Sequence, residues 1–285
     1  MARKVNVLVT GGSGLLGRTL TPLLVDKYQI VHLDLVDPAD DNPCLPVDLC
    51  DARAVEEACR GMDAIIHAGA LHGRRWAEAG DDAGFRVNVL GTKNILEGAR
   101  KAGVKRVVYT SSIWATGHGP NPPYLPIDEE LPREPMELYG LTKKLGEQMC
   151  RYISINYGIS TICLRPGGIL PADAAPASRI GLLSAAVDVR DVAQAHVLAL
   201  EAPADMLHET FCITADSPLC RISPEEWATN PVNALERELP GMGKLIEEGK
   251  LRPSSIREWY SIEKAQRLLG YRPQYRFDPA SFQED

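Results

Sequence analysis

Hydrophobic residues in the first 165 positions fall into short runs that alternate with helix-forming stretches. The runs have the length and β-branched content of buried strands, and the stretches between them have helical spacing. The predicted strands are 5–9, 30–34, 63–67, 106–110 and 161–165, and the predicted helices include 52–60, 81–101 and 137–157. This alternation predicts an α/β fold: an open, doubly wound parallel sheet with helices on both faces. Right-handed crossovers then bring the carboxyl ends of the strands to one edge.

The pattern loosens beyond residue 165. Residues 166–176 are rich in Pro, Gly and Ala and predict a loop, whereas 188–201 predicts a helix, 210–214 a strand and 261–269 an amphipathic helix. We therefore expect a main domain at 1–165 and a small substrate-binding lobe over most of 166–285, with 188–215 returning to the sheet. The loop 117–135 holds six prolines, and we expect it to form a stiff wall of the site.

A glycine cluster separates the first strand from the helix that follows. Gly12, Gly14 and Gly17 satisfy G-x-G-x-x-G, in which glycines allow a tight turn and leave backbone N–H groups open to a pyrophosphate. Asp34 ends the second strand about 20 residues later, where an acid binds the adenosine ribose. The next residues carry no Arg or Lys for a 2′-phosphate, so the sequence favours NAD in a Rossmann domain. The alternatives are a loop without a ligand and a strand-end cap at Asp34.

Tyr139 and Lys143 are four residues apart and share one face of a predicted helix. A free tyrosine has a pKa near 10, and a nearby ammonium lowers it toward the range of a useful base. Lys143 can also bond the nicotinamide ribose. Ser112 follows a strand end, where it would hold a substrate oxygen beside Tyr139. The sequence thus predicts a catalytic set of Ser112, Tyr139 and Lys143, against the alternative of a solvated helix face.

Composition excludes several other classes of function. A net charge of -7 disfavours nucleic acid and anionic membranes as partners. Seven cysteines without a C-x-x-C pair and six histidines without H-x-x-x-H spacing indicate neither a metal site nor a disulfide framework. No segment has the length of a signal peptide's apolar core or of a membrane span, so we expect a cytoplasmic protein with reduced thiols.

The chain resembles the extended short-chain dehydrogenase/reductase family, the group of NAD-dependent nucleotide-sugar epimerases and dehydratases. The resemblance covers nearly the whole chain. Its motifs are 10–17 (TGGSGLLG), 48–49 (DL), 67–70 (HAGA), 88–92 (NVLGT), 110–112 (TSS), 139–143 (YGLTK), 165–167 (RPG) and 188–193 (DVRDVA).

The resemblance also implies how the cofactor is held. The key glycines become Gly11, Gly14 and Gly17, with Leu15 and Leu16 between the last two. Asp48 and Leu49 would lie at the adenine. Ala68, Gly69 and Ala70 would run beneath the cofactor, and Asn88 would lie near the nicotinamide unless it only caps a helix.

Two departures from the family narrow the chemistry. Sugar dehydratases have an Asp-Glu pair after the catalytic Ser or Thr, but this chain has Ile113 and Trp114, so dehydration is disfavoured. Only 167–187 is available for the insertion that clamps a nucleotide diphosphate. This length resembles the uronate-dehydrogenase type, and Arg179 falls about where that type grips the substrate carboxylate. Ile113 and Trp114 again stand where a polar pair is expected, so the substrate need not be a uronate.

Other residues are assigned to the substrate pocket as hypotheses. We expect His72 and Ile113 to face it, together with Arg74 and Arg75 unless these two lie in a solvated loop. We expect Trp114 to form a wall unless it is core packing. The leading hypothesis is an NAD-dependent oxidoreductase acting on a hydroxyl or carbonyl of a sugar, sugar acid or related molecule. The alternatives are an NAD-dependent nucleotide-sugar 4-epimerase and a non-catalytic NAD-binding protein. By analogy with the family we expect a homodimer through the helix after Asn88 and the helix bearing Tyr139.

Overall fold

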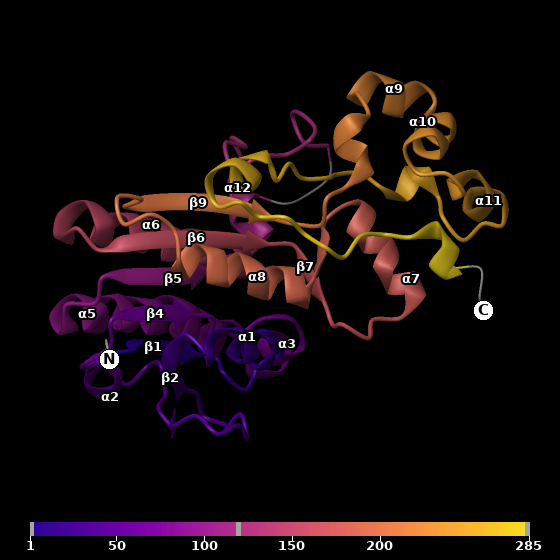
Figure 1. Ribbon diagram of the computed structural model, residues 1–285. Helices are drawn as coiled ribbons and strands as arrows, with labels where there is room; N and C mark the ends of the chain where they lie inside the picture. The colour runs from indigo at the N-terminus through magenta and orange to yellow at the C-terminus, as the bar shows by residue number, and fades with distance from the viewer. Residues whose placement is uncertain (1–2, 118–120, 283–285) are drawn as a thin grey trace. The chain divides into compact units, whose positions relative to one another are not determined.

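The computed structural model describes residues 3–117 and 121–282, and the predicted loop 117–135 lies partly outside them. Within the described residues one sheet contains seven strands in the order β3-β2-β1-β4-β5-β6-β9, and the pairs from β3 to β6 are parallel (Figure 1). The strands are β1 (Val5–Thr10), β2 (Tyr28–Leu33), β3 (Cys44–Leu45), β4 (Ala64–His67), β5 (Arg106–Thr110), β6 (Ser160–Pro166) and β9 (His208–Ile213). The predicted doubly wound α/β fold is confirmed. The strand order reverses between β1 and β4, which is the point where such sheets bind dinucleotides.

Three helices cover one face of this sheet: α2 (Ala52–Cys59), α5 (Thr92–Ala102) and α6 (Leu138–Tyr157). Their apolar side chains share a core cluster with residues of β1, β2, β4, β5 and β6. Local chemistry sets the helix ends. The Asp51 side chain accepts hydrogen bonds from the first turn of α2, and Gly158 ends α6 with a φ of 69°, which glycine adopts without strain. Helix α1 (Leu15–Leu24) follows the glycine cluster, and α8 (Val189–Leu200) carries His196, whose ring bonds the Thr110 hydroxyl.

The region after β4 is more helical than predicted. Arg74 and Arg75 lie in helix α3 (Gly73–Ala79) and not in the loop that was the alternative for them. The single helix expected at 81–101 is divided into α4 (Asp81–Phe85), a π-helical segment η1 (Arg86–Gly91) and α5. A π-helical turn widens the backbone locally, and such turns are frequent at functional sites.

The chain divides into two compact units. The first contains the described residues within Met1–His118, Arg133–Arg165 and Ala193–Phe211, and the second those within Gly119–Pro132, Pro166–Val192 and Cys212–Asp285. The main break therefore follows Arg165, and part of the later chain returns to the first unit. The assignment of substrate binding to the second unit stays a prediction, as does the role of the proline-rich loop as a wall.

The second unit has its own small sheet and core. The prediction of a loop at 166–176 is partly wrong, because β7 (Gly168–Leu170) pairs in parallel with β8 (Ala186–Asp188). Trp259 is fully buried in a separate apolar cluster. The other elements are α7 (Pro176–Arg179), η3 (Ile180–Leu183), η4 (Pro218–Arg221), α9 (Pro224–Thr229), α10 (Pro231–Glu238), α11 (Met242–Glu247), η5 (Pro253–Ser255), α12 (Glu263–Leu268) and η6 (Pro279–Phe282).

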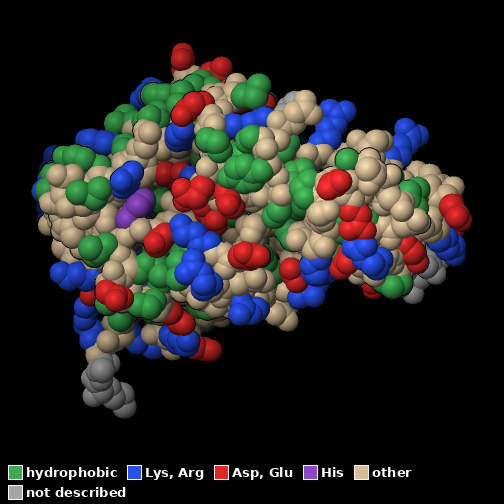
Figure 2. Space-filling view, turned by 90° about the horizontal axis from the view of Figure 1, so that it is seen from above, with side chains coloured by type: hydrophobic (Ala, Val, Ile, Leu, Met, Phe, Trp, Pro, Cys, Tyr) green, Lys and Arg blue, Asp and Glu red, His purple; other side chains and the backbone are tan. Residues whose placement is uncertain are grey.

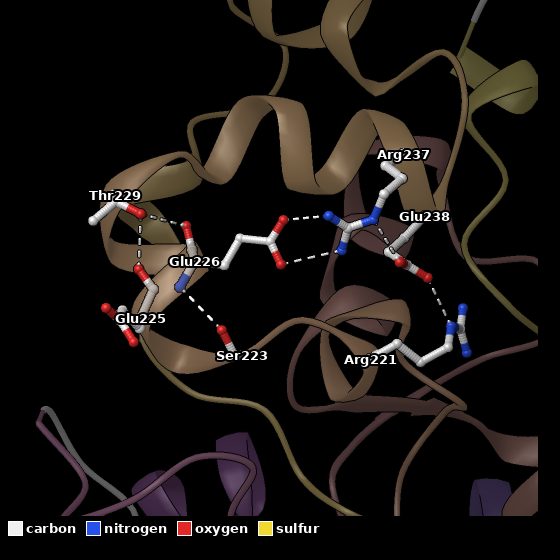
Figure 3. Close-up of polar contacts among 7 residues, drawn as sticks. All are labelled: Arg221, Ser223, Glu225, Glu226, Thr229, Arg237 and Glu238. Atoms are coloured by element: carbon white, nitrogen blue, oxygen red, sulfur yellow. Dashed lines mark hydrogen bonds and ion pairs between the residues drawn. The ribbon is translucent and has the colours of Figure 1, made fainter.

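Charged side chains join the short helices of this unit. The Ser223 hydroxyl caps α9 by accepting from the Glu226 N–H, and Arg237 pairs with both Glu226 and Glu238 (Figure 3). Arg221 bonds the other Glu238 oxygen at 3.0 Å. Acidic and basic side chains are likewise interspersed with hydrophobic ones over the face drawn in Figure 2.

Candidate active site

The glycine cluster turns at Gly11. Gly11 has a φ of 73°, and a Cβ there would lie 2.8 Å from the backbone nitrogen of Gly69. Gly12, which the simple motif uses, does not have a positive φ. It is needed because a Cβ would collide with the buried ring of His32. A Cβ on Gly17 would lie 2.5 Å from the carbonyl oxygens of Gly11 and Gly12, so this glycine lets α1 start against the turn.

The amino end of α1 fits an anion. Gly14 caps the helix with extended backbone and no side-chain hydrogen bond. Leu15 is 43% exposed and Leu16 is buried, so the first turn has one open and one anchored side. Helix N–H groups at such an end point toward a phosphate, and the helix dipole favours negative charge there. The binding of a pyrophosphate at this turn stays a prediction.

Asp34 stands next to this turn. Its Oδ2 accepts from the backbone N–H and the hydroxyl of Ser13, at 3.0 and 2.8 Å, and its Oδ1 accepts from Val36 N–H. A carboxylate has about four acceptor sites, so the ribose hydroxyls expected at Asp34 still have room to bind. Within the described residues these Asp34 contacts involve no basic side chain.

The predicted cofactor floor is assembled at the ends of β1 and β4. Gly69 N–H donates to the Thr10 hydroxyl at 2.9 Å, and Leu49 packs so closely that a Cβ on Gly69 would lie 3.1 Å from Leu49 Cδ1. Ala68 and Ala70 flank Gly69 and are partly exposed, whereas the exposed Asp48 accepts from Cys50 N–H. Small residues with a partly open surface suit the underside of a flat cofactor, and this role stays a prediction.

His67 lies beneath this floor in a fully buried polar chain. Its ring nitrogens bond the hydroxyls of Thr10 and Thr92, at 2.7 and 3.0 Å. Burial, aided by the positive charge of Lys143, lowers the pKa of His67 to about 3. The ring is therefore neutral at ordinary pH and serves as a structural hydrogen-bonding group.

Asn88 links the chain after β4 to α6, and its place near the nicotinamide stays a prediction. It is buried in the π-helical segment, and its amide clamps the backbone of Leu71 by accepting from the N–H and donating to the carbonyl, at 2.8 and 2.9 Å. Its Nδ2 also lies 3.3 Å from the Thr142 hydroxyl on α6. Asn88 thus holds the chain after β4, and the alternative of a helix cap is not what the structure shows.

The predicted catalytic residues come together in the first unit. Ser112 caps the short helix η2 (Ile113–Thr116) beyond β5, and its hydroxyl bonds the phenol of Tyr139. Lys143 lies one turn later on α6 and is buried. Its ammonium donates to the Thr110 carbonyl at 2.8 Å and lies 5.9 Å from the centre of the Tyr139 ring. A proton-transfer oxygen, a hydroxyl donor and a cation therefore share one sheet edge.

The pKa values of this set differ from the sequence expectation. Burial raises the pKa of Tyr139 to about 12, and only the Ser112 hydrogen bond opposes it. Lys143 does not directly bond the phenol, and burial lowers its own pKa to about 8. The expected lowering of the Tyr139 pKa by Lys143 is thus not seen in this structure.

Two indoles flank the Tyr139 ring. Trp114 meets it edge-on at 6.4 Å between centroids, and its role as a pocket wall stays a prediction. Its neighbour Ile113, which was also expected at the substrate, is buried. Trp76 on α3 meets the ring at 5.9 Å, and its Nε1 donates to Asp81. Sequence reasoning missed Trp76, although its place just after β4 put it near the carboxyl edge.

The cations expected in the pocket have separate surroundings. His72 begins α3, and its pKa is lowered by burial of the ring and by the charges of Lys143 and Arg75. Arg74 pairs with Glu78 at 3.4 Å. Arg179 belongs to the second unit, where its guanidinium donates to the carbonyls of Ala172 and Ala174. Its binding of a substrate carboxylate stays a prediction.

Sequence reasoning also missed Glu147, which is buried on α6 two turns after Tyr139. An acid on the apolar face of an amphipathic helix was the available signal. No group of His, Cys, Asp and Glu in the described residues could hold a metal ion. No helix among them is long and apolar enough to span a membrane.

These features define a dinucleotide-binding fold with a tyrosine-centred site. Residues 7–173 match the model of the NAD dependent epimerase/dehydratase family, so the chain belongs to that family, and the predicted resemblance is confirmed.

Individual relatives have different activities in their names. A putative UDP-glucose 4-epimerase of Methanocaldococcus jannaschii is 31% identical over 190 residues, which cover 64% of this chain and 62% of the relative. A uronate dehydrogenase of Pseudomonas putida is 32% identical over 170 residues, 58% of this chain and 61% of the relative. The chain thus matches about three fifths of the length of these relatives. A solved structure described as a mutated uronate dehydrogenase superposes with a TM-score of 0.70 at 26% identity, over 99% of this chain and 85% of the other.

Proposed function

We propose that this protein is an NAD-dependent oxidoreductase that transfers hydride between nicotinamide and a hydroxyl or carbonyl group of a sugar, a sugar acid or a related molecule. The observation that carries the proposal is the hydrogen bond between Ser112 and Tyr139, with Lys143 one turn away. A Tyr–Ser pair at the sheet edge that also holds the glycine turn is equipped for proton transfer beside a dinucleotide.

The residues that would hold NAD are those of the glycine turn and of the predicted cofactor floor. Gly11, Gly14 and Gly17 leave the backbone open, and Asp34 offers carboxylate oxygens at a ribose position. When bound, oxidised NAD would supply the hydride acceptor and a positive ring charge. That charge is of the sign needed to favour phenolate at Tyr139, whose pKa is otherwise raised to about 12.

The protein's own residues then divide the work. Ser112 donates to the substrate oxygen and fixes its orientation. The Tyr139 phenolate removes the hydroxyl proton in oxidation, and the Tyr139 phenol returns a proton in reduction. Lys143 places a positive charge one helical turn from the phenol. Trp76 and Trp114 limit how the Tyr139 ring can move. Positioning and electrostatics are therefore the protein's share of catalysis.

The first experiment follows nicotinamide absorbance with NAD and a panel of aldoses, uronic acids and nucleotide sugars. Stoichiometric NADH with a free sugar or sugar acid is the expected result. Tyr139→Phe should lower turnover by roughly 10²–10⁴-fold while leaving NAD affinity within about twofold. Tyr152→Phe, on the exposed side of the same helix, is the matched control and should leave both unchanged. Loss of NAD binding in Tyr139→Phe would contradict the assignment.

A nucleotide-sugar 4-epimerase is the second candidate, because a relative with that name is 31% identical to this chain. The same Tyr139, Ser112 and Lys143 would serve it, with NAD retained and regenerated in each cycle. Interconversion of a nucleotide sugar without net NADH would favour this candidate over the first.

The proposal includes a homodimer and a cytoplasmic setting. Apolar side chains are exposed on α4 and η1, which precede α5, and along α6, which supports association through this part of the first unit. They include Phe85, Leu90, Leu141, Tyr152 and Ile155, exposed by 39–68%. All seven cysteines are free, a state that the reducing cytoplasm maintains.

A further inference from the structure

A buried carboxylate lies on the catalytic face of α6. Glu147 follows Lys143 by one helical turn and Tyr139 by two, and its side chain is 9% exposed. Residues four apart on a helix are neighbours, with about 5–6 Å between their Cβ atoms. Glu147 therefore lies beside Lys143, on the side away from Tyr139.

Two partners from the strand ends hold this carboxylate. The Ser111 hydroxyl donates to Oε1 at 2.5 Å, and Arg165 donates to Oε1 and Oε2 at 2.8 and 2.7 Å. Ser111 directly precedes Ser112, and Arg165 lies near the end of β6. A forked guanidinium–carboxylate contact fixes direction as well as distance. Glu147 thus joins the helix of Tyr139 to the strand end of Ser112.

The groups around the Lys143 ammonium differ in charge from Glu147. Tyr139 faces the ammonium from the same helix, Tyr109 from β5 lies 5.2 Å below it, and His67 and His72 approach from β4 and from the start of α3. The two histidines are neutral and the two tyrosines protonated, because burial shifts the pKa of each in that direction. Arg165 is a cation, held on the far side of Glu147. Among these groups Glu147 is the one that carries a negative charge, which together with the Thr110 carbonyl stabilises a charged Lys143 against the burial that lowers its pKa.

We propose that Glu147, fixed by Ser111 and Arg165, is a positioning residue that keeps Lys143 protonated and anchors the helix of Tyr139 to the strand end of Ser112. The inference rests on the proposed function, since it assigns a role relative to that catalytic set. A purely structural tether would require the same hydrogen bonds but no electrostatic link to Lys143, so the experiment must measure the charge on Lys143 itself.

The test is a pH titration of the Lys143 side chain by NMR in protein labelled with ¹³C-lysine. Lys143→Arg identifies the signal, and the midpoint in the unaltered protein should fall near 8. Glu147→Gln keeps the shape of the side chain, removes its charge and leaves Arg165 uncompensated. The midpoint should fall by on the order of one pH unit. An unchanged midpoint would overturn the proposal.

Two further variants make the result decisive. Glu97→Gln removes an acid from a surface pair with Arg100 on α5 and should leave the midpoint unchanged. Glu147→Gln combined with Arg165→Met removes both charges, so the midpoint should lie between those of the unaltered protein and the single variant. The double variant also tests the proposal if Glu147→Gln alone does not fold. A Lys143 midpoint equal to that of the unaltered protein would again refute the electrostatic role.

The titration needs neither substrate nor turnover. If no substrate in the panel is oxidised and no nucleotide sugar is interconverted, the proposed function fails while the Lys143 midpoint still reports on Glu147. If turnover is found but Glu147→Gln leaves the midpoint in place, the proposed function stands and the role of Glu147 fails.

Discussion

Replacing Gly11 by alanine tests whether the turn after β1 depends on the close approach of two backbones. Gly11 combines two demands. Its φ is 73°, and an added Cβ would lie 2.8 and 2.9 Å from the nitrogen and Cα of Gly69. Gly103, which ends α5, has nearly the same φ of 74° but nothing within 4 Å of an added Cβ. Gly103→Ala is therefore a control that carries the conformational strain without the collision.

The two costs can be separated by magnitude. An L-residue in the left-handed region costs roughly 1–2 kcal/mol, which is the whole effect expected for Gly103→Ala. Overpacking adds roughly 1–3 kcal/mol where neighbours must shift. The atoms facing Gly11 belong to the backbone and cannot rotate away, so Gly11→Ala should lie in the upper half of the combined range, at about 3.5–5 kcal/mol.

Thermal unfolding followed by far-ultraviolet circular dichroism measures the difference. One kcal/mol corresponds to a shift of about 2–4 °C in a domain of 150–250 residues, so Gly11→Ala should melt several degrees below Gly103→Ala. Trp76 and Trp114 provide a fluorescence signal from the same unit. Gly11→Ala should also weaken NAD binding, whereas Gly103→Ala should not. Equal melting temperatures and equal NAD affinities in the two variants would refute the reasoning.

Three further predictions concern other parts of the first unit. The folded-state pKa of His67, about 3, lies below its ordinary 6.5, so the unfolded chain binds the proton more tightly, and stability is lost as pH falls through 6.5 toward 3. The free energy of unfolding should be about 2 kcal/mol lower at pH 5 than at pH 7. This difference should vanish in His67→Gln, which should be less stable than the unaltered protein at pH 7. The same dependence on pH in the variant would count against this role of His67. Asp34→Ala should weaken NAD binding by calorimetry about tenfold or more, and an unaltered affinity would remove Asp34 from the ribose site. Ile155→Glu, which places a charge on an apolar side chain 68% exposed, should shift a dimer to monomer in light scattering, and a monomer before substitution would exclude the dimer.

The features that sequence reasoning placed correctly are those that local patterns encode. Buried strands are recognised in the sequence as continuous apolar runs, and the order of strands and helices then allows few topologies. Tyr139 and Lys143 could be put on one helix face because helical periodicity fixes that relation without any knowledge of the fold. The helix predicted at 137–157 ends at Tyr157, because Gly158 closes the last turn in the left-handed conformation.

The features that it missed depend on contacts between distant segments. Gly11 and Gly12 both fit a glycine motif. Only the structure shows that Gly11 faces the backbone of Gly69 and that Gly12 faces the ring of His32. The β7–β8 pair joins three-residue segments that are too short to show a periodic pattern. The pKa of Tyr139 follows from the depth of its burial, which spacing along a helix does not reveal.

Hydrogen bonds between elements, rather than within them, shape the edge where the candidate site lies. His67 of β4 bonds the end of β1 and the start of α5, and Asn88 holds the chain after β4 while touching α6. Glu147 ties α6 to β5 and β6. Each of these polar groups is buried, and leaving a partner unsatisfied costs roughly 1–3 kcal/mol, so few arrangements of the strand ends satisfy all of them together. Because Tyr139 and Lys143 are placed by the same helix that Asn88 and Glu147 fix, the network that defines the fold at this edge also sets the position of Tyr139 relative to Ser112.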